Sequence, residues 1–252
     1  MVDSCRAKLR LTLSVSLGLG VWGSAASAGG LDFSRATMGR TTYPEGSWIV
    51  DTTQRYTVRR TGDPSGDTFR SSVELEHGQT ERFSWTAGLE TTDARRDRVQ
   101  PGRGVLAARY MAVTAPLQVT PRAEYRPSLR RQAEEWELGF EALKNFERLS
   151  IVFNGNAQSS QEPGEKRLYV GSVMLGPLYR FGLNGIAGVQ WVQGTDGNRH
   201  LATQVGGAVS KNIYLGVDSH FGLSRRAPDL QAAVKVHFYF GAYRRQAFGL
   251  AP

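Results

Sequence analysis

Three consecutive residues, Asp218, Ser219 and His220, are the best candidates for chemistry in this sequence, because a serine nucleophile needs a base within hydrogen-bond reach. Their spacing opposes that chemistry if they lie on a β-strand, where neighbouring side chains point to opposite faces. Ser219 would then face away from His220, and Asp218 would share the face of His220 without a serine. We therefore predict no catalytic residues.

The remaining histidines and one glycine-rich stretch give no cofactor site. His77, His200 and His237 are remote in the sequence and lack the spacing of metal ligands. The stretch YRFGLNGIAG, residues 179–188, has the glycines of a phosphate-binding loop, but no helix follows it, and glycine in a strand usually marks a bend or close packing. We expect the histidines to be ordinary polar residues, and we predict neither a metal nor another cofactor.

The first residues predict export from the cytoplasm. Basic residues precede an apolar run, Leu11–Gly23, and a small-x-small cleavage site follows at Ala26–Ala28. The apolar run is shorter than the ~20 residues that a membrane-spanning helix requires. We therefore predict a signal peptide over residues 1–28 and one domain over residues 29–252. Cys5, the only cysteine, lies in the predicted signal peptide, so we expect no disulfide in the exported chain.

Charge and composition argue against two classes of protein. The predicted signal peptide carries three of the 31 basic and one of the 23 acidic residues, so residues 29–252 have a net charge of +6. The basic residues are mostly arginine and are scattered rather than grouped with aromatic residues, which argues against nucleic-acid binding. No later segment has about 18 consecutive apolar residues, so we expect no membrane-spanning helix.

The elements that must position all of these residues are strands, because apolar and polar residues alternate with a period of two along segment after segment. Twelve segments are predicted to be strands: Trp48–Arg59, Phe69–Glu76, Phe83–Glu90, Arg103–Ala115, Leu117–Arg126, Glu134–Lys144, Leu149–Ser159, Leu168–Gly176, Leu183–Gly194, His200–Ser210, Ile213–Gly222 and Leu230–Phe240.

One of these segments, Glu134–Lys144, has the composition of a helix. Its Glu, Leu, Ala and Lys residues cost little free energy in a helix. Its large apolar residues nevertheless alternate, and Trp136 and Leu138 would point about 200° apart on a helix but share one face of a strand. The eleven neighbouring segments favour a strand, so we predict that tertiary context overrides propensity here.

The connections between the strands favour a transmembrane barrel. Long polar connections alternate with tighter turns, such as Gly78–Thr80, Asn145–Arg148, Lys211–Asn212 and the looser Pro177–Gly182. With an even number of strands, this is typical of an up-and-down antiparallel β-barrel with long outer loops and short periplasmic turns.

The alternative is a secreted two-sheet sandwich, which would turn the apolar residues inward. Aromatic residues near strand ends favour the barrel, in which they form girdles at the two membrane interfaces. These aromatic residues are Trp48, Tyr56, Phe69, Phe83, Tyr125, Trp136, Phe153, Trp191, Tyr214, Phe221 and Phe238 to Phe240.

The polar face of a transmembrane barrel must line its lumen, because lipid cannot satisfy charged groups. Twelve strands lie between the eight whose interior side chains can fill and the sixteen of an open porin. The lumen is therefore either a narrow channel or a plug of salt bridges. The candidate lumen-lining residues are Arg55, Arg59, Glu74, Glu76, Arg122, Glu124, Arg126, Glu135, Glu137 and Glu141.

The register of the fifth and sixth strands follows from a loop centred near Arg130 and Arg131. Residues whose numbers sum to 261 should then face each other, with Tyr125 opposite Trp136 on the lipid side. The same register places Glu124 opposite Glu137 in the lumen, and a slip of one residue would send charges into lipid.

The sequence from Tyr43 to Glu90 resembles the start of a group of bacterial outer-membrane barrels that are related to the phenol-degradation MetA-pathway transporter-like family. The likeness rests on a Pro-x-Gly entry into the first strand, YPEGSWIVDTTQRYTVRRTGD, and on a turn of the type E-x-G-x-T-[DE]-R, which is Glu76 to Arg82 here. The later LKNFERLSIVFNGN, residues 143–156, is similar to their paired strands around a charged turn. The resemblance implies a Gram-negative outer-membrane protein and uptake of hydrophobic or aromatic compounds.

These observations together predict an outer-membrane barrel that acts as a passive channel or transport-like protein for small solutes. Its expected partners are outer-membrane lipid, the barrel-assembly machinery and small hydrophobic or aromatic solutes. An outer-membrane enzyme that modifies lipid and a structural or adhesin-like barrel remain alternatives. The tail, residues 241–252, follows the last aromatic residue of the final strand and has no predicted role.

Overall fold

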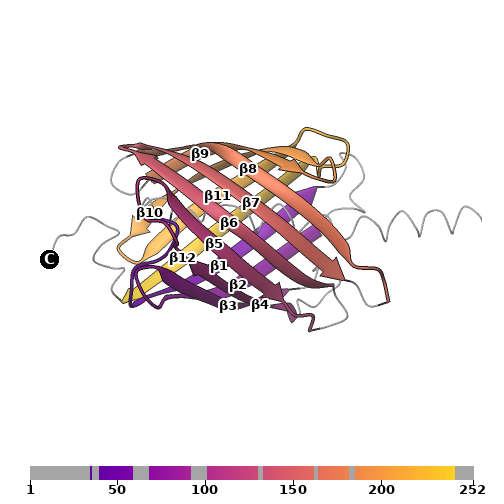
Figure 1. The fold of residues 1–252 in the computed structure, drawn as a ribbon, viewed down its shortest axis with the longest axis horizontal. Coiled ribbons are helices and arrows are strands. Elements are labelled where there is room, and N and C mark those ends of the chain that lie inside the picture. The colour runs from indigo at the N-terminus through magenta and orange to yellow at the C-terminus, as the bar shows by residue number, and fades with distance from the viewer. Residues whose placement is uncertain are drawn as a thin grey trace, which may run out of the picture.

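The computed structural model describes Arg35 and residues 40–58, 68–91, 101–129, 133–161, 164–181 and 185–241; the predicted signal peptide lies outside these residues. Twelve antiparallel strands close into a barrel in which β1 pairs with β12, as the sequence predicted (Figure 1). The strands are β1 (Ser47–Val58), β2 (Thr68–Gly78), β3 (Phe83–Thr91), β4 (Pro101–Tyr110), β5 (Gln118–Arg126), β6 (Glu134–Phe146), β7 (Leu149–Gln161), β8 (Leu168–Phe181), β9 (Gly185–Gly194), β10 (Arg199–Ser210), β11 (Ile213–Gly222) and β12 (Leu230–Gly241).

The alternation of the sequence becomes the two sides of the barrel wall. Large apolar side chains point outward along the strands; Leu138, for example, is 61% exposed. Charged and amide side chains at the intervening positions are buried within the ring, as for Glu137 at 5%. A sandwich would bury the opposite set, so this inversion excludes it.

The register of β5 and β6 is the predicted one, and Glu134–Lys144 lies in a strand. Tyr125 pairs with Trp136 and Glu124 pairs with Glu137, without a bulge. The rings of Tyr125 and Trp136 stack on the outer side with their centroids 4.1 Å apart. By contrast, β4 and β5 share only the pairs from Leu106 opposite Tyr125 to Arg109 opposite Arg122, the shortest pairing between described neighbouring strands.

Several predicted strand ends are wrong, and the largest error concerns Pro177. The expected turn Pro177–Gly182 lies mostly in β8, which continues to Phe181. Pro177 is tolerated because it has a ladder partner in Ile151 of β7, while the pairs between β8 and β9 skip from Leu175 to Leu178.

Two further strand ends differ. β6 continues to Phe146, so its turn to β7 contains only residues 147 and 148, with Glu147 at a φ of 43°. β4 ends at Tyr110 rather than Ala115, and beyond it a single bridge joins Val113 to Val119.

The aromatic residues form two outer belts, with two exceptions to the prediction. Trp48 and Phe240 lie at the end of the short turns, and Trp136 lies near the long loops. Tyr214 and Tyr239 instead point into the barrel and are 2% and 1% exposed. Both are an even number of residues away from inward polar residues on the same strand, so they also face inward. A position near a strand end was therefore not enough to predict a place in the outer belts.

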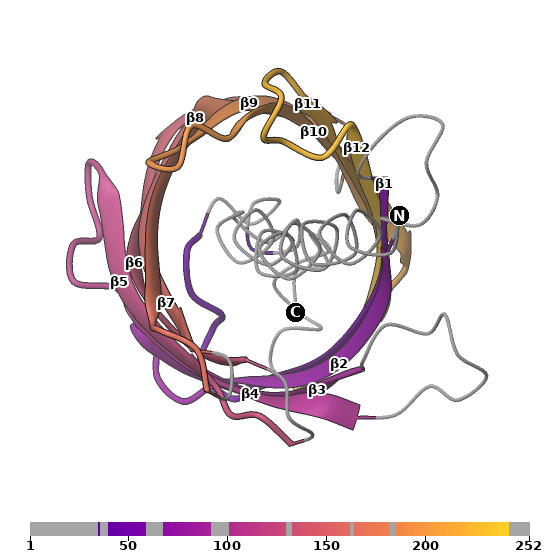
Figure 2. The same cartoon turned by 90° about the vertical axis from the view of Figure 1, so that its right-hand side faces the viewer.

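The short turns, the start of β1 and the end of β12 all lie at one end of the barrel, which we call the short-turn end. Within the ring, the described residues that precede β1 lie inside the lumen (Figure 2). No helix in the described part of the chain is long and apolar enough to cross a membrane.

The outer side of β6 allows a direct test of the barrel orientation. We expect Leu138→Arg to lower the free energy of unfolding in lipid vesicles by ~2–4 kcal/mol, the cost of a lipid-facing arginine near the midplane. The matched change Gln158→Arg adds the same side chain on the lumenal side, opposite Glu137, and should cost much less. Equal losses in reversible urea unfolding would contradict the assigned orientation.

Candidate functional site

Ion pairs along the inner side of β2 to β6, together with Arg35 from the chain before β1, form what we call the lumenal ladder. All of its side chains are largely buried, and each described member contacts at least one opposite charge. The ladder consists of the carboxylates Glu76, Glu90, Glu124, Glu135, Glu137 and Glu141 and the guanidinium groups of Arg35, Arg70, Arg103, Arg109, Arg122 and Arg126.

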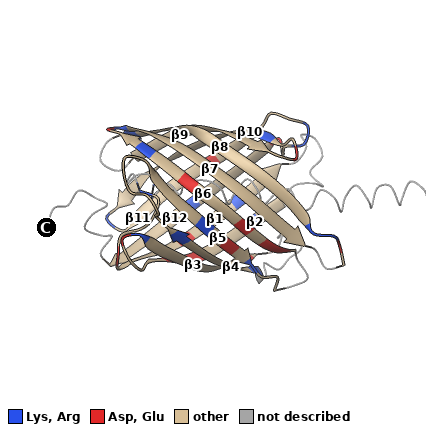
Figure 3. Ribbon diagram, viewed as in Figure 1, with Lys and Arg blue, Asp and Glu red and all other residues tan. Residues whose placement is uncertain are grey.

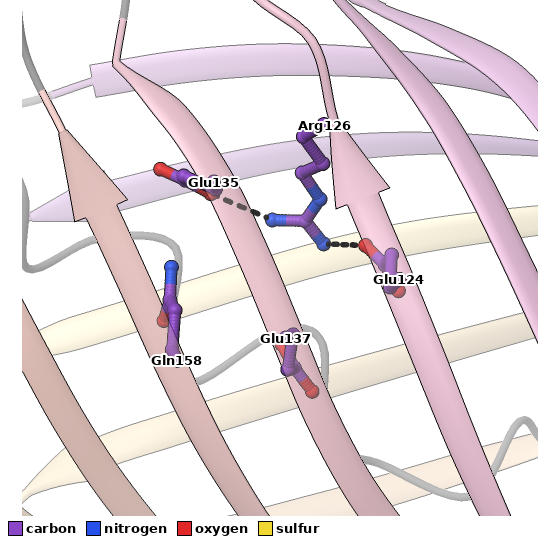
Figure 4. Close-up of a pocket in the computed structure, with 5 residues that line it drawn as sticks. All are labelled: Glu124, Arg126, Glu135, Glu137 and Gln158. Atoms are coloured by element: carbon purple, nitrogen blue, oxygen red, sulfur yellow. Dashed lines mark hydrogen bonds and ion pairs between the residues drawn. The ribbon is translucent and has the colours of Figure 1, made fainter.

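Glu135 connects two arginines of this ladder. Its Oε2 accepts a hydrogen bond from Nη1 of Arg126 at 3.2 Å (Figure 4). Its Oε1 accepts a hydrogen bond from Nη1 of Arg103 at 2.6 Å. Arg126 also contacts Glu124, with Nη2 2.6 Å from Oε1. Beside these groups is a small, tightly lined hollow, which Gln158 also lines. Arg103 and Arg126 are thus both paired with carboxylates of the wall rather than free to bind a solute anion.

Arg122 reaches its partner across a glycine. It is opposite Gly139 in the register, and it forms an ion pair with Glu137 and donates to Oδ1 of Asn156 at 3.0 Å. A Cβ at Gly139 would lie 2.3 Å from that same Asn156 oxygen and 3.3 Å from Nε of Arg122. The missing side chain therefore provides the space in which the diagonal ion pair forms.

The candidate lumen-lining residues fall on the inner side of the wall wherever the structure describes them. Arg55 and Glu74 share the inward parity of buried neighbours on β1 and β2. Arg59 lies outside the described residues. The structure thereby brings together residues from β1, β2, β5 and β6, but their part in permeation stays a prediction.

The opposite wall of the lumen carries little charge. β7 and β9 contain no charged residue, and β8 and β10 are mostly tan in Figure 3. Buried amides such as Asn154 and Gln190 face inward there. A small apolar cluster of Met174, Val192 and Ala202 lies on the same wall. The lumen is therefore amphipathic, with a charged side and a side of amides and apolar groups.

At the short-turn end, the lumen is filled by apolar side chains that we call the collar. The collar gathers residues from β1 and from β6 to β12 around Tyr43, which precedes β1. Its buried members are Tyr43, Ile49, Leu143, Val152, Leu178, Ile186, Tyr214 and Tyr239, with Ala208 packed against them.

Residues Arg40–Gly46, the inner strap, cover the remaining side of this end. Thr41 and Thr42 are fully buried, and the hydroxyls of Thr41 and Thr120 of β5 lie 2.6 Å apart. Arg40 forms an ion pair with Glu81 at 2.6 Å in the turn after β2. The strap thus crosses the β2 to β5 side, which contributes nothing to the collar.

One set of contacts holds the strap against the wall, and another holds Arg35, which precedes the strap, in the lumen. The N–H of Gly46 donates to the carbonyl of Gly78 at 2.8 Å, and a Cβ on Gly78 would lie 2.1 Å from the carbonyl oxygen of Pro44. The guanidinium of Arg35 lies 5.6 Å from the Tyr43 ring centroid and 4.0 Å from Glu141. Only glycine at position 78 permits this approach.

The histidines do not assemble a nucleophile or a metal site among the described residues. Nε2 of His220 lies 3.5 Å from Oδ2 of Asp218 on the inner side, whereas Ser219 is on the outer parity, as the strand geometry predicted. His200 faces His220 at 6.0 Å between centroids, and His237 lies 3.3 Å from Asp51. No group of three possible metal ligands forms in the described part of the chain.

No family model matches this sequence, and no curated protein is similar to it. Solved structures are similar in fold. An outer membrane channel from Pseudomonas putida F1 superposes with a TM-score of 0.62 at 11% identity, over 79% of this chain and 97% of that chain. The chain has the fold of outer-membrane channels.

Two porins share the same fold. The KdgM porin in complex with disordered oligogalacturonate matches with a TM-score of 0.57 at 11% identity, over 76% of this chain and 98% of that chain. The NanC porin matches with a TM-score of 0.54 at 9% identity, over 76% and 98%.

Sequence reasoning missed the inner strap and the collar. The strap residues show no periodicity, because they are held by individual contacts rather than by a strand ladder. The collar did leave a signal: Tyr214 shares parity with Asp218 and His220, which places it inward.

Proposed function

We propose that this chain is an outer-membrane channel that passes small solutes through the lumen of its barrel. The observation that carries the proposal is the lining: charged and amide side chains occupy the inward positions along most of the lumen, where a purely structural barrel needs only packed apolar groups. The outward apolar surface and its two aromatic belts support a location in the membrane.

The charge balance of the lumenal ladder favours small neutral or zwitterionic solutes over polyanions. Its six carboxylates offset its six guanidinium groups, so the ladder offers no excess positive charge to an acidic polymer. The apolar cluster of Met174, Val192 and Ala202 faces this ladder across the barrel. Such a lumen suits solutes with an apolar or aromatic part and a polar end, in line with the resemblance of the sequence.

Single-channel recording in planar bilayers tests the proposal directly. We expect the refolded protein to give small conductance steps, because the collar and inner strap narrow the short-turn end. Liposome swelling with neutral solutes should show uptake that falls with solute size. A folded, heat-modifiable barrel with neither conductance nor swelling would overturn the proposal and leave the structural or adhesin-like alternative.

Selectivity provides a second test at a single residue. We expect Glu137→Gln to shift the reversal potential in a salt gradient towards anion selectivity, because it removes a lumenal negative charge while Arg122 stays. Arg122 keeps its contact with Asn156, so the barrel should still fold. The control Gln158→Asn, in the same hollow, should leave selectivity unchanged. An unchanged reversal potential in Glu137→Gln would show that the ladder does not line the conduction path.

A lipid-modifying enzyme remains a weaker alternative, since Ser219 and His220 are on opposite sides of β11. It would require lipid hydrolysis that His220→Ala abolishes, and conductance would then be incidental.

A further inference from the structure

Three aromatic rings on the outer side of the wall form a compact cluster that the channel function does not use. Trp48, His77 and Trp85 are direct cross-strand neighbours on β1, β2 and β3. The imidazole stacks on Trp48 with the centroids 3.9 Å apart, and the centroid of Trp85 lies 5.6 Å from His77 and 5.7 Å from Trp48. The three rings are all within a few residues of the short-turn end.

One hydrogen bond decides what the imidazole can do. Nδ1 of His77 lies 3.0 Å from the carbonyl oxygen of Ser47, and a carbonyl can only accept, so Nδ1 carries the proton. In the neutral ring, Nε2 is therefore left with its lone pair and acts as a hydrogen-bond acceptor. A ligand of this cluster must bring an N–H or O–H donor.

The indole rings select the charge of that donor. The faces of tryptophan rings attract cations through their quadrupole, and Trp48 is 38% exposed on the outer side. The two indoles are nearly perpendicular, at 86°, so a cation near His77 can lie over the face of one indole at a time, because the edge of an aromatic ring is positive. A cationic N–H donor fits this combination of an acceptor and aromatic faces.

We propose that this tryptophan–histidine cluster binds the primary ammonium head group of a phospholipid, such as phosphatidylethanolamine, in the periplasmic leaflet. The site lies at the level of the outer aromatic belt, where head groups meet the barrel, and the short turns place that belt on the periplasmic side. The proposal rests on the proposed membrane location. A quaternary ammonium would satisfy the indoles but has no N–H for Nε2.

Native mass spectrometry of the refolded barrel with matched lipids tests this. With equal acyl chains, we expect phosphatidylethanolamine to bind about tenfold more tightly than phosphatidylcholine or phosphatidylglycerol, as one charge-assisted hydrogen bond would give. Stepwise N-methylation of the ethanolamine should weaken binding most at the quaternary step, where the last N–H is lost. Equal binding of all three head groups would overturn the proposal.

Substitutions separate the two parts of the site. His77→Phe keeps a stacked ring but removes the acceptor, so phosphatidylethanolamine should fall to the affinity of phosphatidylcholine. His77→Gln supplies an amide oxygen and should restore part of the preference, and Trp48→Leu should weaken both lipids. The control Trp136→Leu disrupts the stacked pair with Tyr125 at the opposite end and should not change the preference.

The same preparations distinguish this inference from the channel proposal. A heat-modifiable band confirms folding, and bilayer conductance is recorded on each variant. Loss of the lipid preference with unchanged conductance in His77→Phe is the expected result. A preference that persists unchanged in both His77→Phe and Trp48→Leu would assign it to another surface and overturn the proposal.

Discussion

A chain that starts at Ser47, without the inner strap, should conduct severalfold more current per channel than the full-length exported chain. The strap supplies Tyr43 to the collar and buries Thr41 and Thr42 inside the short-turn end, so its removal opens space at the end that the collar fills. Conductance of an aqueous pore follows the width and lining of its constriction. Single-channel recording of the truncated and full-length proteins under the same salt measures the difference.

Two variants of the full chain test whether the strap itself is responsible. Gly78→Val should displace the strap, because its Cβ would lie 2.1 Å from the carbonyl oxygen of Pro44, and should raise conductance in the same direction. Gly104→Ala is the control at the long-loop end, where a Cβ would meet only the side chain of Pro127 at 2.9 Å. Equal conductance of the truncated and full-length chains would show that the strap lies outside the permeation path.

Glu135→Leu should lower the free energy of unfolding by about 3–5 kcal/mol, because it removes the carboxylate that two buried arginines share and leaves Arg103 with the longer contact to Glu90 at 3.8 Å. Glu135 is 2% exposed and contacts both Arg103 and Arg126. Reversible urea unfolding in lipid vesicles measures the loss.

The adjacent Glu134→Leu is the matched control for this change. Glu134 points outward at the start of β6, where its carboxylate accepts a hydrogen bond from Trp136 at 3.2 Å, so its loss should cost no more than about 0.5 kcal/mol. Adding Arg103→Met to Glu135→Leu should recover part of the stability, since it removes the buried guanidinium that has lost its closer carboxylate partner. Equal costs at positions 134 and 135 would contradict the ladder.

The wall of the barrel was predictable from the sequence because a period of two leaves one choice for each side chain. Leu138 and Glu137 illustrate this, because neighbouring residues of a strand face opposite sides, so Leu138 faces lipid only if Glu137 faces the lumen. The structure has the predicted pairs between β5 and β6. The side of each charged residue followed from the same rule, since lipid cannot accommodate an arginine such as Arg122.

What could not be predicted depends on contacts between elements that the alternation does not relate. The hydroxyls of Thr41 and Thr120 are in contact although the residues are 79 positions apart, and no local sequence pattern predicts that contact. Pro177 was read as a turn because proline lacks a ladder donor, yet pairing on one side of β8 suffices to keep it in the strand. Strand ends and lumenal fillings therefore required the three-dimensional structure.

The regular ladder between β4 and β5 is the shortest between described neighbouring strands, and backbone hydrogen bonds such as Gly104 to Pro127 and Ala112 to Val119 continue the contact beyond its two ends. Charged side chains of the lumen reinforce the wall at this place, because Arg103 of β4 reaches past β5 to Glu135 of β6, and Arg109 of β4 lies 4.0 Å from Glu141 of β6. The side chains that would meet a solute are thus the ones that keep the wall closed. A substitution that alters selectivity at these positions therefore also affects the integrity of the wall, whereas the inward residues of β7 and β9, two strands without charged residues, can change without breaking an ion pair.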